Sequence, residues 1–242
     1  MLRADPAHHL IVSVHQPHFL PWLGYLNKVL HSDVFVWLDT VQYRKNYYQN
    51  RTVIRTRRGE ELWLTLPVHA PFGTPIDRVT VADPKWRDRL SKTVEQNYGR
   101  APFFSVCWPE IAKALEGASD TLTDVDFRAF NAVLRLLRAG DVRVVRAGEL
   151  GVTSAEPTER LVEACRAVGG KSYIAGKGGK NYLRIEAFEE AGIGVAWQQF
   201  DPAAQPYPQT GLGFVPGLSV IDCLFNIGPD EAGRLIRAAW AP

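Results

Sequence analysis

Two histidines near the start of the chain are the first residues that can do chemistry. His15 and His18 lie three residues apart, directly after the apolar run 10–14. Imidazole titrates near neutral pH, so either ring can act as a general acid or base. A zinc site normally needs three or four ligands, and no cluster of Cys, His or carboxylates accompanies this pair. We therefore expect no metal, see no evident cofactor, and keep a hydrogen-bonded structural role open for both histidines.

Two aspartates are further candidates for catalysis. Asp39 ends the second apolar run of the chain and is, with His15, a candidate base. Asp222 interrupts the apolar stretch 218–225, where a polar residue inside a helix is either buried and paired or functional. Ser219, three residues earlier, would make a capping-box-like pair with Asp222. The sequence leaves the structural and the catalytic interpretation of Asp222 equally open.

A glycine-rich segment is the clearest indication of an anion site. Residues 176–182, Gly-Lys-Gly-Gly-Lys-Asn-Tyr, follow the expected strand 172–175. Glycine lets backbone N–H groups approach a ligand closely, and Lys177 and Lys180 add positive charge. The segment matches neither the Walker A pattern nor the dinucleotide spacing of glycines. It predicts binding of a phosphate or carboxylate, with a plain surface turn as the alternative.

Cations and amides gather in the segment that follows Asp39. Arg44, Lys45 and Arg51 are interspersed there with amide side chains. Such groups suit an anionic, hydroxyl-rich ligand such as a nucleotide sugar, although a solvated charged loop would have the same composition. The residues that we expect to contact substrate are Gln16, His18, Trp22, Tyr25, Gln42, Asn50, Arg51, Tyr173, Gly176, Lys177, Tyr182, Tyr207 and Gln209.

The elements that position these residues form an α/β pattern. A strand over 10–14, a short helix and a strand over 34–38 make a βαβ unit, in which ligands lie at the carboxyl ends of the strands. Strands and helices alternate again in the second half of the chain. We predict a mainly parallel sheet flanked by helices, Rossmann-like or nucleotidyltransferase-like, with an inserted β-hairpin around 52–66. The other expected strands cover 142–145, 172–175 and 194–198, and the longer helices cover 86–98, 109–115, 124–138, 157–168 and 185–191.

Composition restricts the class of protein. The 242 residues are 46% hydrophobic with a net charge of +2, which is typical of a globular protein and not of a bulk nucleic-acid binder. No apolar run approaches the roughly 20 residues that a membrane span needs. The three cysteines are isolated and set in apolar surroundings, as in reduced proteins. We expect a cytoplasmic protein with a single domain over 1–242.

Motifs spread along most of the chain resemble the WbqC-like protein family. They are HQPHFLPWLGY (15–25), DVFVWLDTVQY (33–43), QNR (49–51), WLTLPV (63–68), YIAGKGGKNYL (173–183), YPQ (207–209) and FVPGLSVIDCLFNIG (214–228), with Trp86 and Tyr98 between them. The resemblance implies a bacterial protein of O-antigen or other surface-polysaccharide biosynthesis. It also implies a glycine (aminoacyl) transferase that acts on amino sugars.

Two departures from the family pattern limit the chemistry. The family often has a second Asp where this chain has Thr40, and a Ser where it has Ala175. A covalent serine mechanism at the glycine-rich segment is therefore unavailable here. The opening of the chain also looks like the nucleotidyltransferase fold, but Trp22-Leu23-Gly24-Tyr25 replaces that superfamily's H-x-G-H. This analogy supports the fold more than the chemistry.

Three functions are compatible with these observations. The first is an acyl or aminoacyl (glycine) transferase that forms an amide on an amino sugar or similar amine, in polysaccharide or natural-product biosynthesis. It would use a small-molecule substrate and an activated, carrier-bound or free, acyl donor. The second is an ATP-dependent ligase or nucleotidyltransferase, and the third is a non-catalytic protein that binds a glycan precursor.

Overall fold

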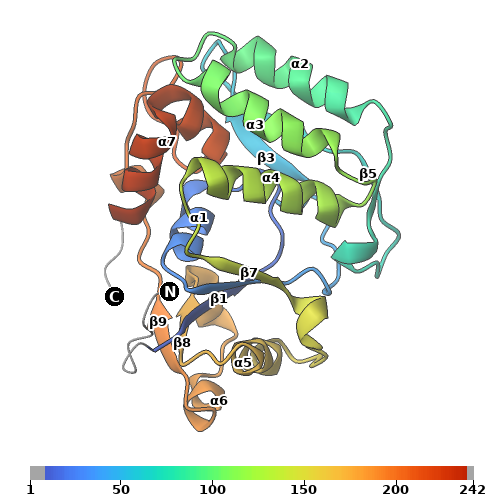
Figure 1. Ribbon diagram of the computed structural model, residues 1–242, viewed down its shortest axis with the longest axis vertical. Helices are drawn as coiled ribbons and strands as arrows, with labels where there is room; N and C mark the ends of the chain where they lie inside the picture. The colour runs from blue at the N-terminus through green and yellow to red at the C-terminus, as the bar shows by residue number, and fades with distance from the viewer. Residues whose placement is uncertain (1–8, 239–242) are drawn as a thin grey trace.

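A five-stranded parallel sheet lies at the centre of the computed structural model, which describes residues 9–238 (Figure 1). The strands are β1 (Ile11–His15), β2 (Val34–Trp37), β7 (Arg143–Arg146), β8 (Ser172–Ala175) and β9 (Gly194–Trp197). They follow the order β7-β2-β1-β8-β9, with every pair parallel. Strand order therefore reverses direction at the β1–β8 pair, as in Rossmann-like sheets. The predicted α/β class is confirmed.

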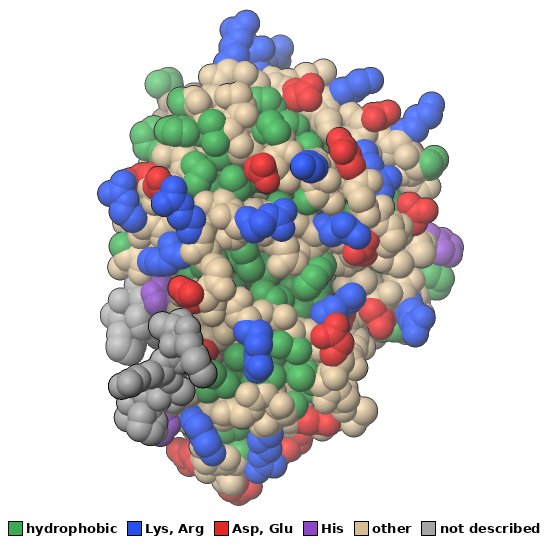
Figure 2. Space-filling model, viewed as in Figure 1, with side chains coloured by type: hydrophobic (Ala, Val, Ile, Leu, Met, Phe, Trp, Pro, Cys, Tyr) green, Lys and Arg blue, Asp and Glu red, His purple; other side chains and the backbone are tan. Residues whose placement is uncertain are grey.

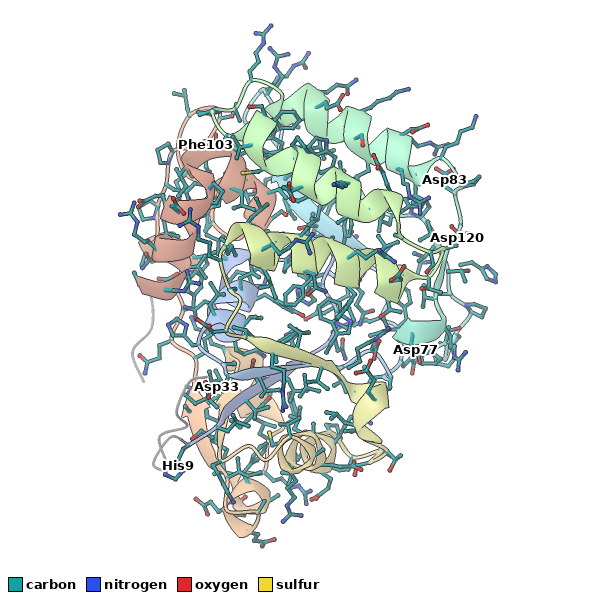
Figure 3. All side chains as sticks on the ribbon, viewed as in Figure 1. His9, Asp33, Asp77, Asp83, Phe103 and Asp120 are labelled. Atoms are coloured by element: carbon teal, nitrogen blue, oxygen red, sulfur yellow. The ribbon has the colours of Figure 1, made fainter. Side chains whose placement is uncertain are left out.

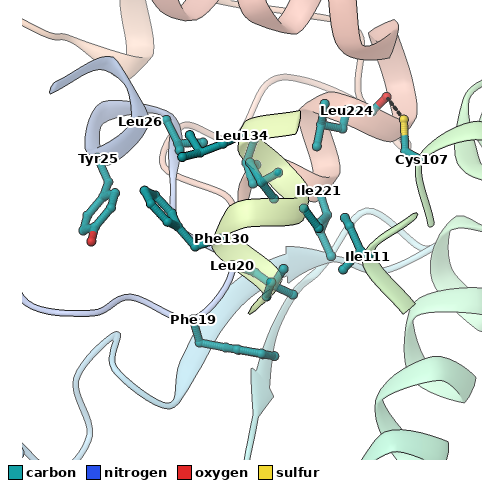
Figure 4. Packing of buried hydrophobic residues seen from close by; sticks show 14 of the residues in the cluster. Phe19, Leu20, Tyr25, Leu26, Cys107, Ile111, Phe130, Leu134, Ile221 and Leu224 are labelled. Atoms are coloured by element: carbon teal, nitrogen blue, oxygen red, sulfur yellow. Dashed lines mark hydrogen bonds between the residues drawn. The ribbon is translucent and has the colours of Figure 1, made fainter. Parts of the chain in front are cut away.

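The alternation of side chains along β2 explains why helices cover both faces of the sheet. Val34 and Val36 point into one apolar cluster, while Phe35 and Trp37 point into the other. The valine face packs against α5 (Pro157–Ala167) and α6 (Ile185–Glu190), which lie below the sheet in Figure 1. The aromatic face packs against α1 (Leu23–Leu30), α4 (Leu122–Leu136) and α7 (Val220–Ala238). Figure 4 shows α1, α4 and α7 contributing to this larger core.

An insertion between β2 and β7 builds the layer above the sheet. It contains the antiparallel hairpin of β3 (Arg51–Arg55) and β4 (Glu61–Thr65), in which Val53 pairs with Trp63. The predicted hairpin is thus confirmed. The insertion also contains the short antiparallel pair β5 (Val68–His69) and β6 (Thr80–Val81), and the helices α2 (Trp86–Tyr98) and α3 (Phe104–Glu116).

Some local predictions differ from the structure. Helix α3 begins at Phe104 instead of residue 109, and Pro109 lies inside it. Proline is expected in the first turn of a helix, but α3 continues through Pro109, and Phe104 and Trp108 on the turn before it pack against Phe225. The remaining elements are the 3-10 helices η1 (Ile76–Arg78), η2 (Ala147–Leu150), η3 (Lys177–Asn181) and η4 (Pro202–Ala204).

Two properties of the molecule as a whole complete the description. On the face shown in Figure 2, Lys and Arg side chains alternate with Asp and Glu, in keeping with a net charge of only +2. The three cysteines are free and buried. Of the helices within residues 9–238, none combines the length and apolar character required to cross a bilayer.

Candidate functional site

A cleft opens at the carboxyl ends of β1 and β8, where strand order reverses. Figure 3 helps to orient the sheet: Asp33 marks the amino-terminal edge of β2, and Asp77 lies near the opposite edge. The cleft consists of a cavity of about 640 Å³ and a smaller one of about 430 Å³. Both are lined by His15, Lys28, Tyr47, Gly176 and Gly178. Ligands of open α/β sheets bind at this position because loops from adjacent strands diverge there.

His15 ends β1 and is neutral at pH 7. Its Nδ1 lies 2.9 Å from the backbone oxygen of Gln16. A carbonyl only accepts, so Nδ1 carries the proton and Nε2 keeps its lone pair. Burial, followed by the positive charge of Lys28 and the neighbouring His18, holds the pKa of His15 well below 6.5. His15 therefore has the tautomer and charge state of a general base.

Lys28 is the functional candidate that the sequence did not reveal. The side chain is on α1, is 3% exposed, and donates from Nζ to the backbone oxygen of Val14 at 3.1 Å. Burial lowers its pKa from 10.5 to about 7. Within residues 9–238 it forms no ion pair with a carboxylate. In the sequence it resembles an ordinary surface lysine of a short amphipathic helix, and only the burial of the whole of α1 shows otherwise.

His18 lies beneath the cleft between two tyrosine rings. It stacks on Tyr25 and Tyr48, with ring centroids 4.8 and 5.3 Å apart. Both of its ring nitrogens are buried and lack a hydrogen-bond partner among the described residues. Burial and the charge of Lys28 lower its pKa to about 3. His18 consequently contributes a neutral, aromatic floor to the smaller cavity.

Gln16 connects the histidine segment to the loop 40–50. Its backbone oxygen accepts from the hydroxyl of Tyr25 at 3.1 Å, and its Oε1 accepts from Nε2 of Gln49 at 2.8 Å. Gln49 in turn accepts from the backbone N–H of Arg44 at 2.7 Å. These bonds hold the loop against the cleft.

The glycine-rich segment forms the opposite wall. A Cβ built on Gly176 or Gly178 would meet nothing within 4 Å, so space for a ligand extends to the backbone at both positions. Lys177 borders the smaller cavity together with Trp22, whose indole would collide with any Cβ on Gly24. Tyr173 and Tyr182 line the larger cavity, as does Gln42.

A third cavity, of about 620 Å³, adjoins the cleft, and we call it the flanking cavity. Its lining includes Asn50 and Arg51, and it shares Gln42, Tyr43 and Arg44 with the larger cavity of the cleft. Asn50 is held by the hydroxyl of Tyr43 at 2.9 Å and by the backbone oxygen of Leu66 at 2.7 Å. The predicted substrate-binding residues on the first half of the chain thus gather around two adjoining spaces, the cleft and the flanking cavity.

Asp39 does not reach the cleft. Its Oδ2 accepts from Nε and Nη2 of Arg146 at 3.0 and 2.6 Å and from the hydroxyl of Thr123 at 2.9 Å. Asp39 is 2% exposed and lines neither cavity of the cleft. The carboxylate therefore ties β2, β7 and α4 together at the edge of the sheet.

Asp222, Tyr207 and Gln209 lie in a separate buried cluster, the Asp222 network, with Tyr98 and Arg55. The hydroxyls of Tyr98 and Tyr207 donate to the two oxygens of Asp222 at 2.7 and 2.9 Å. Gln209 accepts at Oε1 from Nη1 of Arg55 at 3.0 Å. The backbone N–H of Asp222 donates to the backbone oxygen of Ser219 at 3.0 Å, and the Ser219 hydroxyl donates to the backbone oxygen of Leu20 at 2.7 Å, so the capping-box pair does not form. None of these residues lines the cleft.

Comparison with known proteins identifies the family of the chain. It is 28% identical over 227 residues to a protein of Mycobacterium tuberculosis (strain ATCC 25618 / H37Rv) with the name "Uncharacterized protein Rv1507c", and the match covers 93% of this chain and 96% of the relative. No solved structure gives a significant match. The model of the WbqC-like protein family matches residues 16–233, which begin directly after His15 and include His18, the glycine-rich wall and the Asp222 network. The chain belongs to the WbqC-like protein family.

Proposed function

We propose that the protein transfers an acyl or aminoacyl group, with glycyl as the favoured group, to the amine of an amino sugar or a similar substrate. Membership of the WbqC-like family supports a role in a biosynthetic pathway. The observation that carries the proposal is His15, a neutral imidazole whose Nε2 keeps its lone pair beside a buried lysine whose pKa is lowered to about 7. Amide formation needs such a base because an amine must lose a proton as it becomes an amide.

The geometry supports a simple sequence of events. The acceptor amine attacks the carbonyl carbon of the activated acyl donor, and the new N–C bond forms as the carbonyl π electrons move to oxygen. Nε2 of His15 takes the proton from the attacking nitrogen. Lys28, when protonated, and the backbone N–H groups of residues 176–178 stabilise the oxyanion, whereas the N–H of Gly179 already donates to the backbone oxygen of Gly176. The oxyanion then collapses, the bond to the leaving group breaks, and the leaving group takes up the proton from His15.

The other expected site residues receive distinct roles in this proposal. Gln16, His18, Trp22, Tyr25, Tyr173, Gly176, Lys177 and Tyr182 shape the cleft around the acceptor and the acyl group. Gln42, Asn50 and Arg51 bind an anionic part of a substrate. Asp39 and Asp222 support the fold, with Tyr207 and Gln209, because Oδ2 of Asp39, both carboxylate oxygens of Asp222 and the amide of Gln209 already have protein partners.

Hydroxylamine provides a direct test because it is a small amine that converts an activated acyl group into a hydroxamate, which forms a coloured complex with added Fe³⁺. We would incubate the protein with a glycyl pantetheine thioester and hydroxylamine and compare wild type with His15→Gln. We expect the rate of hydroxamate formation to fall by about 100-fold or more in His15→Gln, which is the contribution typical of a general base. The matched control is His69→Gln on β5, an exposed histidine outside both cavities of the cleft. Wild-type turnover in His15→Gln would contradict the proposed role.

A specific observation also supports an ATP-dependent ligase or nucleotidyltransferase as the second candidate. The cleft lies at the strand-order reversal of a parallel sheet, where nucleotides bind in Rossmann-like folds. The same assay with glycine, ATP and Mg²⁺ in place of the thioester distinguishes the two. Hydroxamate together with pyrophosphate or ADP release would indicate the ligase. Saturable binding of substrates with no turnover under either condition would indicate a non-catalytic glycan-precursor binding protein.

A further inference from the structure

The flanking cavity concentrates positive charge, and no carboxylate lines it. Arg44, Lys45 and Arg51 line it, and no Asp or Glu does. Within residues 9–238, none of these three cations forms an ion pair. The whole chain has a net charge of only +2, so this local excess is not a property of the surface in general. Uncompensated cations around a concave space attract an anion.

Two of the three cations, Arg44 and Arg51, are held in place by neighbouring groups. The guanidinium of Arg51 lies 4.1 Å from the centroid of the Trp63 ring and also donates to the backbone oxygen of Asn46. Nε of Arg51 is buried and has no hydrogen-bond partner among the described residues. The guanidinium of Arg44 lies 4.9 Å from the ring centroid of Tyr47. An arginine fixed by stacking presents its remaining N–H groups in one plane, which suits the oxygens of a phosphate.

An aromatic ring stands at the rim of the same cavity. Phe72 is 99% exposed and lines the cavity together with the cations. Burying a fully exposed ring against the flat face of a ligand would be favourable, and base–aromatic stacking contributes about 1–3 kcal/mol in nucleic-acid complexes. Cations for phosphates and an exposed ring for a base are the two features that a nucleotide requires.

The flanking cavity adjoins the reactive cleft. Gln42, Tyr43 and Arg44 line both. The loop that carries Arg44 is also bonded to the cleft through Gln49 and Gln16. A ligand held by its phosphates in the flanking cavity can therefore extend its other end toward His15.

We propose that the flanking cavity binds the diphosphate of a nucleotide-linked substrate whose reacting group lies in the cleft. Arg44, Lys45 and Arg51 contact the diphosphate, and Phe72 stacks on the base. The identification of the ligand as a substrate rests on the proposed function, whereas the anion site itself does not. Two sources share this chemistry: a nucleoside-diphosphate amino sugar as the acceptor, and a coenzyme A thioester as the donor.

Calorimetric titration of the full chain with inorganic pyrophosphate, UDP and coenzyme A tests the site. We expect saturable binding of pyrophosphate that weakens by at least tenfold in the double variant Arg44→Gln/Lys45→Gln. The matched control is Arg58→Gln, an exposed arginine in the turn of the neighbouring hairpin that does not line the flanking cavity, and it should bind as wild type does. Phe72→Ala should weaken the binding of UDP or coenzyme A by about fivefold and leave the binding of pyrophosphate unchanged.

The two sources give different results in this experiment. Tighter binding of UDP than of coenzyme A identifies the acceptor, and the reverse identifies the donor. Absence of saturable binding of all three ligands at millimolar concentration would overturn the proposal, as would equal losses in the double variant and in Arg58→Gln. These titrations require no turnover, so a diphosphate site is detected even if the transferase assay is negative. Conversely, hydroxamate formation without diphosphate binding would support the proposed function and contradict the proposed diphosphate site.

Discussion

The cleft and the Asp222 network both contain buried polar groups, but only in the Asp222 network do all of these groups have hydrogen-bond partners within the described residues. In the Asp222 network, each carboxylate oxygen accepts from a tyrosine hydroxyl, and the guanidinium of Arg55 donates to Gln209 and to backbone oxygens of residues 59, 212 and 213. In the cleft, Lys28 has no carboxylate partner and His18 has no hydrogen bond among the described residues.

The difference shows that a polar residue in an apolar stretch of sequence can be either fully hydrogen-bonded or without a partner in the folded protein. A buried polar group that is fully hydrogen-bonded stabilises one conformation, and removing its partner leaves a costly unsatisfied group. A buried polar group with unused hydrogen-bonding capacity destabilises the free protein and is available to a ligand. We therefore expect substitutions in the two regions to change stability in opposite directions.

The largest effect should come from Asp222→Ala. The substitution leaves the buried hydroxyls of Tyr98 and Tyr207 without acceptors, at about 1–3 kcal/mol each. We expect the free energy of unfolding to fall by about 4 kcal/mol in urea denaturation at pH 7. Tyr207→Phe, which leaves the Tyr98 bond intact, should lose about half as much. A loss under 1 kcal/mol in Asp222→Ala would show that the network is not a structural support.

Lys28→Met should raise the free energy of unfolding, whereas Asp222→Ala should lower it. Burial lowers the pKa of Lys28 from 10.5 to about 7, so the unfolded chain binds more protons than the folded one between these values. Stability therefore rises with pH from about 7 to 10.5 in the wild type, and below pH 7 the full destabilisation persists. Removing the amine should raise the free energy of unfolding by about 3 kcal/mol at pH 7, after allowing for the lost bond to Val14.

Urea denaturation at pH 7 and pH 10 measures this effect. The difference between wild type and Lys28→Met should shrink at the higher pH because folding then removes a proton that the unfolded lysine, with a pKa of 10.5, holds only weakly. Lys92→Met on the exposed face of α2 is the matched control and should show no such difference. If Lys28→Met is less stable than wild type at pH 7, Lys28 stabilises the fold as the Asp222 network does, and the prediction is wrong.

Asp39→Asn distinguishes a structural from a catalytic aspartate. Asn keeps one oxygen for Arg146 and Thr123 but loses the charge, so about 2 kcal/mol of stability should be lost. Hydroxamate formation should change by less than threefold because the carboxylate does not line the cleft. A hundredfold loss of turnover in a folded Asp39→Asn variant would instead identify Asp39 as the base.

The smallest effect at neutral pH is expected for His18→Phe. Phe keeps the ring between Tyr25 and Tyr48, and neither ring nitrogen forms a hydrogen bond within the described residues. Because burial lowers the pKa of His18 to about 3, the wild type loses stability as pH falls from 6.5 toward 3. His18→Phe should avoid about 1.4 kcal/mol of that loss per pH unit. Parallel acid unfolding curves for the two proteins would contradict this assignment.

The sequence determined the local features because they depend on neighbours along the chain. Apolar runs indicated the five strands of the sheet, and β8 covers the predicted residues 172–175. The same apolar runs predicted that His15 and the glycine-rich segment follow the carboxyl ends of strands, and the structure brings these two segments together there. The hairpin was visible because two apolar runs flank the turn at Gly59, whose φ of 84° favours glycine.

Only the tertiary structure decided which polar residues are partnered. Nothing near Lys28 in the sequence indicates that it is 3% exposed beside two histidines, since its burial results from packing of the whole of α1. Asp222 meets Tyr98 across 124 positions, and Asp39 meets Arg146 across 107. Desolvation and hydrogen-bond partners depend on residues far apart along the chain, and local periodicity contains no information about them. The sequence therefore identified the candidates for chemistry, whereas the packing separated those that complete the fold from those available to a ligand.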